Sequence, residues 1–156
     1  MSKFWLIKSE PSEFSIEDLE KSKNQTTYWD GVRNYQARNF IRDEMKMGDK
    51  VLFYHSNAEP NAIVGICEVV REAYPDHTQF DPKHNHYDPK ADKKNPPWFM
   101  IDIKFEKKFK KQVTLEDIKS NSKLSKMRLV ERGNRLSVMP VTKEEIEEIL
   151  KMSNLG

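Results

Sequence analysis

The chain of 156 residues has one cysteine, five glycines and no long apolar run. Cys67 stands alone, so no intrachain disulfide can form, and its place in the apolar run 63–67 predicts a buried, unreactive thiol. The apolar start is too short for a signal peptide. No later run approaches the ~20 apolar residues of a membrane-spanning helix. We therefore expect an intracellular protein with no membrane partner, cytoplasmic or, in a eukaryote, nuclear.

Two catalytic signatures are also missing. The chain has no glycine-rich phosphate loop, which argues against a nucleotide-hydrolysing fold. It has no glycine–serine–glycine turn of the kind that presents a nucleophilic serine. There is no internal repeat, low-complexity tract or linker either. We expect a single domain over residues 1–156, with no cofactor.

Charge is nearly balanced overall but unevenly distributed. The net charge is only +2, which by itself does not suggest nucleic acid. The stretch 104–135, however, carries eleven Lys or Arg against four Asp or Glu. A one-sided basic strip can hold a phosphate backbone, although a solvated face is the alternative for any single lysine. The candidate phosphate-binding residues are Arg33, Arg38, Lys108, Lys110, Lys111, Arg132 and Arg135.

The hydrophobic pattern predicts strands interleaved with short helices. Strands are expected at 3–8, 51–55, 63–70, 98–105 and 136–139, with helices near 15–21, 34–45, 114–119 and from 142 onward. Residues 24–31 read as a loop, and the proline-rich segment 74–97 as a long irregular excursion. Most links between strands are too short for helical crossovers. The predicted class is α+β, a mainly antiparallel small barrel or sheet flanked by short helices.

The run 29–38 is the most informative part of the chain. It combines Trp29 and Tyr35 with a glycine, two arginines and several amide or carboxylate groups. A core segment has fewer polar groups, and a solvated loop has fewer aromatics. The mixture suits a site that stacks on a flat ring and hydrogen-bonds its edge, as a base taken out of its stack requires.

Other side chains at predicted strand ends extend this candidate site. Tyr54 and Trp98 are candidates for stacking, whereas Trp5 on the first strand is expected in the core. Candidates for hydrogen bonds to the edge of a ring are Ser9, Asn34, His55 and Ser137. Stacking of a base on an aromatic side chain contributes ~1–3 kcal/mol.

Two other chemistries are alternatives to this site. A metal site is conceivable at Asp81, His84, His86 and Asp88 with His77 nearby, but the spacing matches no zinc signature, and a solvated loop is the simpler interpretation. Nucleophilic catalysis is conceivable for His55 with Ser9 and Glu10, yet no motif supports it. No catalytic residue and no metal ligand are therefore assigned.

Several sequence blocks carry a family resemblance. They are 4–11, 27–40, 48–49, 53–57, 63–65, 74–76, 87–89, 97–98 and 135–138 with Pro140. On these blocks the chain resembles the EVE domain family, within the PUA-like group that also includes YTH domains. The resemblance implies a PUA-like fold and a pocket for a modified base, either of the 5-methylcytosine type in DNA or a modified base in RNA. The implied pocket residues are Lys8, Ser9, Glu10, Trp29, Val32, Asn34, Tyr54, His55, Trp98, Leu136 and Ser137. Met139 stands where the family pattern leads us to expect glutamine.

The resulting hypothesis is a non-enzymatic, monomeric binder of nucleic acid that carries modified bases. The alternative is a small hydrolase that acts on an amide or a nucleobase in the same pocket.

Overall fold

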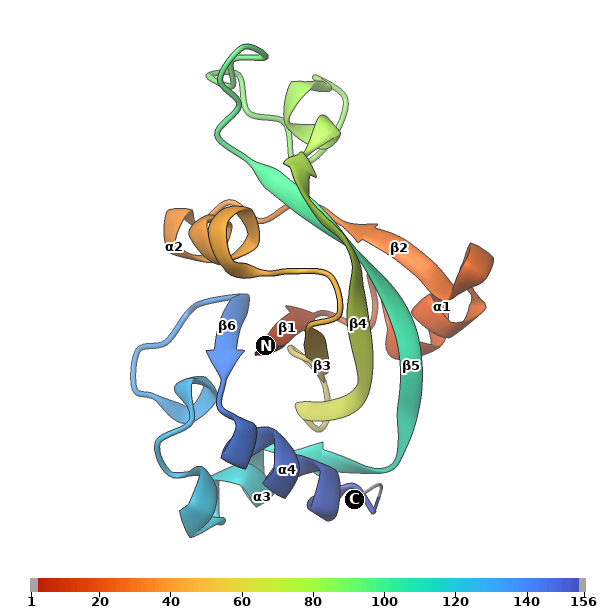
Figure 1. The fold of residues 1–156 in the computed structure, drawn as a ribbon, viewed down its shortest axis with the longest axis vertical. Coiled ribbons are helices and arrows are strands. Elements are labelled where there is room, and N and C mark those ends of the chain that lie inside the picture. Colours follow the sequence, from red (N-terminus) through yellow and green to blue (C-terminus); the bar gives the residue numbers. More distant parts are fainter. Residues whose placement is uncertain (1–2, 155–156) are drawn as a thin grey trace.

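The structure is a computed structural model that describes residues 3–154. Six strands form one sheet in the order β2-β5-β4-β3-β1-β6 (Figure 1). Their bounds are β1 Phe4–Ser9, β2 Thr26–Trp29, β3 Lys50–His55, β4 Ala62–Pro75, β5 Phe99–Thr114 and β6 Val138–Val141. Within the sheet only β1 and β3 pair in parallel, and the other four pairs are antiparallel. The predicted mixed α+β class with a mainly antiparallel sheet is confirmed.

The hydrophobic core lies against the central strands. Trp5, Leu6 and Ile7 of β1 and Phe53 of β3 are almost completely buried. Trp5 also donates its Nε1–H to the buried carboxylate of Asp49 (2.9 Å), which satisfies the one polar atom of the indole. Trp5 is therefore a core residue, as its place on the first strand predicts.

The long antiparallel pair β4–β5 determines where the irregular segment lies. Both strands extend beyond the sheet's centre and carry residues 76–98 at one end, drawn in green at the top of Figure 1. Several register shifts interrupt the pair, and such bulges bend and twist a strand. The bent pair thereby places residues 76–98 near α2 and the end of β2 (Figure 1).

Short helices pack around the sheet, and side chains that cap their N-termini explain where they begin. The bounds are α1 Ile16–Lys21, α2 Tyr35–Asn39, α3 Leu115–Lys119 and α4 Lys143–Met152. α2 continues directly into a π-helical turn over Phe40–Glu44, so the predicted helix near 34–45 is confirmed in two parts. Reciprocal capping boxes start three of the helices, at Ser15 with Asp18, Thr114 with Asp117 and Thr142 with Glu145.

Several expectations about the strands were wrong. β4 continues to Pro75, five residues beyond its predicted end at residue 70, because it pairs with β5 as far as Phe99. Thr26–Trp29 is a strand, β2, rather than part of a loop, because it pairs with Ile101–Lys104 of β5. β5 extends to Thr114 through the lysine-rich stretch, since β4 supplies a partner along most of its length. β6 lies two residues later than expected. It includes Pro140, which an edge strand tolerates because one side needs no ladder hydrogen bond.

Cys67 is completely buried in β4, and burial raises the pKa of its thiol far above the ordinary value. The thiol therefore stays protonated and unreactive, as its place in an apolar run predicts. Across residues 3–154, the helices are all too short or too polar to cross a membrane.

Candidate functional site

Trp29 and Asn34 lie at opposite ends of one short connection. Trp29 is the last residue of β2, and Asn34 is the N-cap of α2, where its side-chain oxygen accepts the backbone N–H of Ala37 (3.0 Å). Ala37 is buried in the core and anchors the helix. The run 29–38 therefore ends in a fixed helix at one side and a paired strand at the other.

The connection itself is held by a buried carboxylate. Asp76 has no exposed surface, and it accepts hydrogen bonds from the backbone N–H of Gly31 (2.8 Å) and from Arg33 Nη1 (3.0 Å). Thr78 donates its backbone N–H to the same carboxylate (2.8 Å). Burial by itself raises the pKa of Asp76, but the hydrogen bonds from Thr78, Gly31 and Arg33 outweigh it and leave the pKa below its ordinary value.

Arg33 joins the same connection to the irregular segment. Its guanidinium donates from Nη2 (2.7 Å) and Nε (3.2 Å) to the backbone carbonyl of His86. The His86 ring lies over Gly31, where an added Cβ would stand 2.4 Å from the ring atom Cε1. Gly31 also has φ +81°, a conformation that favours glycine. The irregular segment thus packs directly on the connection after β2.

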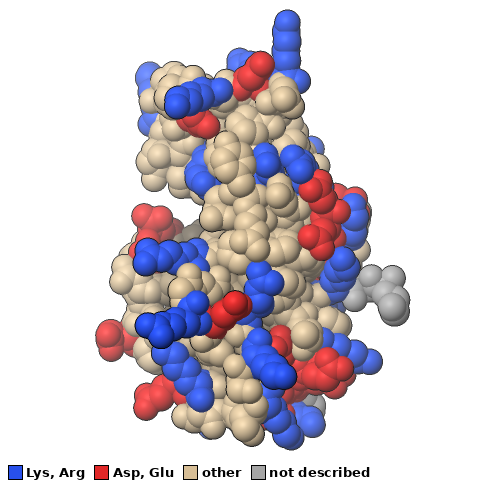
Figure 2. Space-filling view, turned by 90° about the vertical axis from the view of Figure 1, so that its left-hand side faces the viewer, with Lys and Arg blue, Asp and Glu red and all other residues tan. Residues whose placement is uncertain are grey.

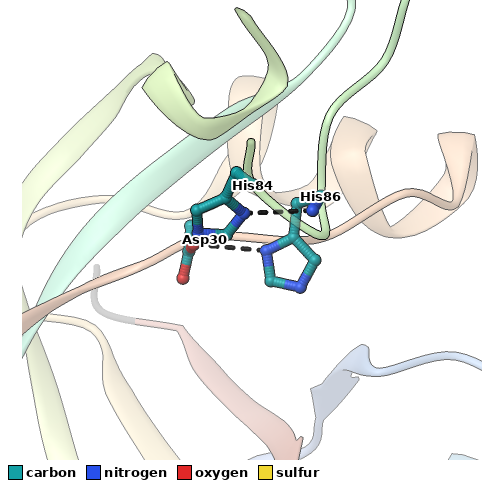
Figure 3. Close-up of side chains that lie close together, drawn as sticks. All are labelled: Asp30, His84 and His86. Carbon is teal, nitrogen blue, oxygen red and sulfur yellow. Dashed lines mark hydrogen bonds and ion pairs between the residues drawn. The ribbon is translucent and has the colours of Figure 1, made fainter. Parts of the chain in front are cut away.

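Asp30, His84 and His86 form a compact polar group (Figure 3). His86 Nδ1 lies 3.3 Å and His84 Nε2 3.9 Å from the same Asp30 oxygen, Oδ2. The backbone N–H of His86 donates to His84 Nδ1 (3.0 Å), so a neutral His84 ring carries its proton on Nε2, toward Asp30. Two imidazoles therefore converge on one carboxylate oxygen.

This group differs from the metal alternative raised by the sequence. Asp30, His84 and His86 each offer an atom within 4.8 Å of the others, a spacing that a metal ion could bridge. In the arrangement present, His86 Nδ1 lies within hydrogen-bond distance of Asp30 Oδ2 (3.3 Å), whereas His84 Nε2 lies farther from it, at 3.9 Å. Asp88 instead accepts the indole N–H of Trp98 (2.8 Å). Asp81 accepts the backbone N–H of Lys83 (3.0 Å) within its own turn.

A cavity of about 710 Å³ opens beside Trp29, and we call it the Trp29 cavity. Its wall combines β1, β2, the connection after β2, and the irregular segment. The lining residues are Lys8, Ser9, Glu10, Glu13, Phe14, Thr27, Tyr28, Trp29, Asp30, Gly31, Val32, Ser56, His84, Asn85, His86, Arg135 and Ser137. The indole of Trp29 is half-buried and held edge-on by Phe53 (5.5 Å between ring centroids) and Phe14 (6.0 Å). It is therefore fixed in orientation while it faces the cavity.

Charges of both signs line the Trp29 cavity. The cations are Lys8 and Arg135, and the carboxylates are Glu10, Glu13 and Asp30. Burial lowers the pKa of Lys8, because it disfavours the charged ammonium form. Glu10 accepts a hydrogen bond from Asn57 Nδ2 (2.8 Å).

A second hollow of about 370 Å³ adjoins the first, and we call it the arginine cavity. It is lined by Asn34, Gln36, Arg128, Glu131, Arg132, Gly133, Asn134, Arg135 and Leu136. Arg135 lines both cavities, so the two hollows are neighbours. Asn134 shapes the arginine cavity by accepting the backbone N–H of Leu136 (3.0 Å) and donating to the buried thioether of Met139 (3.5 Å).

The implied pocket residues divide into three sets. Lys8, Ser9, Glu10, Trp29, Val32 and Ser137 line the Trp29 cavity, and Asn34 and Leu136 line the arginine cavity. The third set, Tyr54, His55 and Trp98, lines neither.

Each residue of the third set has a packing role. Tyr54 is buried in the core, and His55 Nε2 accepts the backbone N–H of Ile16 (3.1 Å). Trp98 is buried beneath Tyr35, with 4.8 Å between the ring centroids. The structure thus brings Trp29 to a cavity and places Trp98 outside it.

Some of the candidate phosphate-binding arginines are exposed, and others already form hydrogen bonds within the protein. Arg132 and Arg135 are exposed at the arginine cavity. Arg33 is committed to Asp76 and His86, and Arg38 donates to the carbonyl of Pro97 (2.6 Å).

The candidate lysines lie on β5. Lys110 and Lys111 are exposed, whereas Lys108 pairs with Glu17 (2.7 Å). Figure 2 shows Lys and Arg interspersed with Asp and Glu on the face it displays, rather than in one unbroken strip.

Sequence reasoning missed several residues of the Trp29 cavity, namely Glu13, Phe14, Thr27, Tyr28, Asp30, Gly31, Ser56, His84, Asn85 and His86. For Asp30 and Gly31 a signal existed, since both lie inside the run 29–38. His84 and His86 reach Asp30 across more than fifty positions, and no periodic pattern reports such a contact.

The chain is similar to several known proteins. The family model for the EVE domain matches residues 3–152. Thymocyte nuclear protein 1 of Gallus gallus is 47% identical over 165 residues, which cover 95% of this chain and 67% of that protein. A hypothetical protein from Leishmania major has a structure with 48% identity and a TM-score of 0.92, over 99% of this chain and 96% of that one. Human THYN1 protein, in complex with 5-methylcytosine-containing DNA, is 44% identical with a TM-score of 0.92, over 97% and 98% of the two chains.

Proposed function

The chain belongs to the EVE domain family, and we propose that it binds DNA by taking a flipped base of the 5-methylcytosine type into the Trp29 cavity, without catalysing a reaction. The observation that carries the proposal is a fixed indole facing an open cavity of about 710 Å³. Sites of ~300–1,000 Å³ are typical for small ligands, so the cavity has room for a nucleoside. The human relative bound to 5-methylcytosine-containing DNA supports the choice of base.

The arginine cavity would hold the phosphates that flank the flipped base. A flipped nucleotide stays attached to the backbone, so its flanking phosphates must lie near the mouth of the base site. Arg132 and Arg135 are exposed beside the Trp29 cavity and suit that position. Contacts of this kind give affinity without reading sequence.

Two contacts weigh against the hydrolase alternative. A general base needs a lone pair directed at a nucleophile, but His55 Nε2 accepts the N–H of Ile16. The Ser9 hydroxyl donates to the carbonyl of Phe14 instead of to a base. His55 is therefore not placed to act as a general base, and Ser9 is not placed to act as a nucleophile.

Titration of matched oligonucleotides tests the proposal. Fluorescently labelled duplexes would carry one cytosine, 5-methylcytosine or 5-hydroxymethylcytosine at the same position, and an RNA of the same sequence with 5-methylcytosine would compete. We expect the modified DNA to bind most tightly, and Trp29→Ala to weaken it on the order of 10-fold or more, because a stacking surface is lost.

Tyr87→Ala is the matched control, since Tyr87 is an exposed aromatic outside both cavities. Equal affinity for every oligonucleotide, unchanged in Trp29→Ala, would sink the proposal. Tighter binding of the RNA would change the partner from DNA to RNA.

A further inference from the structure

The lining of the Trp29 cavity carries more carboxylates than cationic side chains. Glu10, Glu13 and Asp30 outnumber the cations Lys8 and Arg135 along the lining. Carboxylates repel a nucleic-acid backbone, so their presence in a nucleotide site is unfavourable unless the ligand donates hydrogen bonds to them. The lining therefore favours a base with a hydrogen-bond donor on its edge.

Asp30 is the carboxylate best placed to receive such a donor. It directly follows Trp29 and lines the same cavity, so it lies beside the site of a base stacked on the indole. Its side chain is only 23% exposed. Glu13, by contrast, is exposed, and Glu10 already accepts a hydrogen bond from Asn57.

The surroundings of Asp30 leave one oxygen available. Within residues 3–154, the hydrogen bonds and ion pairs of the Asp30 side chain run through Oδ2, to His86 and His84 (Figure 3). The backbone beyond it is fixed because Gly31 donates to buried Asp76. The carboxylate is thus held in position while Oδ1 keeps its lone pairs for a ligand.

We propose that Asp30 is the specificity-determining residue of the Trp29 cavity, where its Oδ1 accepts the exocyclic 4-amino group of a cytosine-type base. The inference rests on the proposed function, because it names the group that reads the base in that same site. A carboxylate only accepts hydrogen bonds, and the 4-amino group of cytosine donates them. Thymine has the same 5-methyl group as 5-methylcytosine but presents an O4 acceptor. Two acceptor oxygens form no hydrogen bond, so thymine should bind less tightly beside Asp30.

The test compares bases of nearly identical shape in single-stranded oligonucleotides, so that the cost of breaking a base pair does not enter. One position carries 5-methylcytosine, thymine, or 5-methylpyrimidin-2-one, which lacks the 4-amino group. For the unmodified protein we expect 5-methylcytosine to bind on the order of 10-fold more tightly than either of the other two. Asp30→Asn should bring the three affinities within about 2-fold of one another, because the amide both donates and accepts.

Glu147→Gln is the matched control, since it removes the same charge from an exposed position of α4 outside both cavities and should retain the preference. Urea unfolding of each variant verifies that it is folded. If Asp30→Asn fails to fold, 5-methylpyrimidin-2-one still deletes the donor in the unmodified protein, and unimpaired binding of that base overturns the inference.

Three outcomes separate the inference from the function on which it rests. Equal binding of 5-methylcytosine and thymine by the unmodified protein overturns the role of Asp30 and leaves base binding standing. A preference retained in Asp30→Asn does the same. No binding of any oligonucleotide contradicts both.

Discussion

The backbone N–H of Gly31 donates to the fully buried carboxylate of Asp76, over 2.8 Å and forty-five positions of sequence. This single bond ties the connection after β2 to the start of the irregular segment. Arg33 adds an ion pair to the same carboxylate. The geometry of Trp29 and Asp30 therefore depends on a residue that does not line either cavity.

Removal of the Asp76 carboxylate should destabilise the protein. Asp76→Ala leaves the Gly31 N–H and the Arg33 guanidinium without their partner, and we expect the free energy of unfolding to fall by about 2 to 4 kcal/mol. The lower part of that range is favoured because Arg33 is 23% exposed and solvent compensates in part. Urea denaturation measures the change, with Asp81→Ala as an exposed control from the same segment. Equal losses in the two variants would contradict the anchoring role of Asp76.

Acid should loosen the same contact. The pKa of Asp76 is lower in the folded protein than its ordinary value of about 3.9. Its contribution to stability is therefore fully present above that ordinary value and is lost as the pH falls through the lower, folded pKa. Urea melts at a series of acidic pH values should show a steeper decline for the unmodified protein than for Asp76→Asn. Parallel declines would show that Asp76 does not titrate in this way.

Gly31→Ala should be costlier than a comparable substitution elsewhere. Gly31 and Gly48 both have positive φ, +81° and +90°, but an added Cβ meets the His86 ring only at Gly31. We expect Gly48→Ala to lower the free energy of unfolding by about 1 kcal/mol from the backbone conformation alone. Gly31→Ala should lower it further and also weaken oligonucleotide binding, since His86 must move. Unfolding and binding that match those of Gly48→Ala would show that His86 adjusts freely.

Binding of DNA should depend on salt through the arginine cavity. Arg132→Gln removes one proposed phosphate contact, so the slope of log K against log salt should become shallower by about 1. The ratio of affinities for modified and unmodified DNA should stay the same, because a phosphate contact carries no base information. Lys151→Gln, on an exposed position of α4, is the charge-matched control. A slope unchanged in Arg132→Gln would place the backbone elsewhere.

Local signals explain which parts of the fold could be predicted from the sequence. Ser15 with Asp18 and Thr142 with Glu145 start their helices through contacts only three residues long, so spacing alone reveals them. β2 was missed because its four residues form a strand only through pairing with β5, more than seventy positions away. β5 likewise extends beyond the residues whose apolar pattern predicts a strand, because it pairs with β4.

In the candidate site, too, residues with a local sequence signal could be predicted, and contacts between distant residues could not. Trp29 was identifiable because a large aromatic stands in a polar, glycine-containing run, a mixture that neither a core nor a solvated loop explains. Trp98 looked equivalent in the sequence, yet its indole N–H donates to Asp88 and its ring lies against Tyr35. Asp30 lies in the same run, but the contacts that hold its carboxylate, to His86 and His84, form only on folding.

A crystal structure of the protein with an oligonucleotide containing one 5-methylcytosine tests the central claim most directly. The account predicts that this base leaves its stack and lies in the Trp29 cavity, with its ring against the indole of Trp29 and a neighbouring phosphate at Arg132 or Arg135. A base that stays stacked within the duplex, while the protein contacts only the backbone and the Trp29 cavity holds no nucleotide, would contradict it.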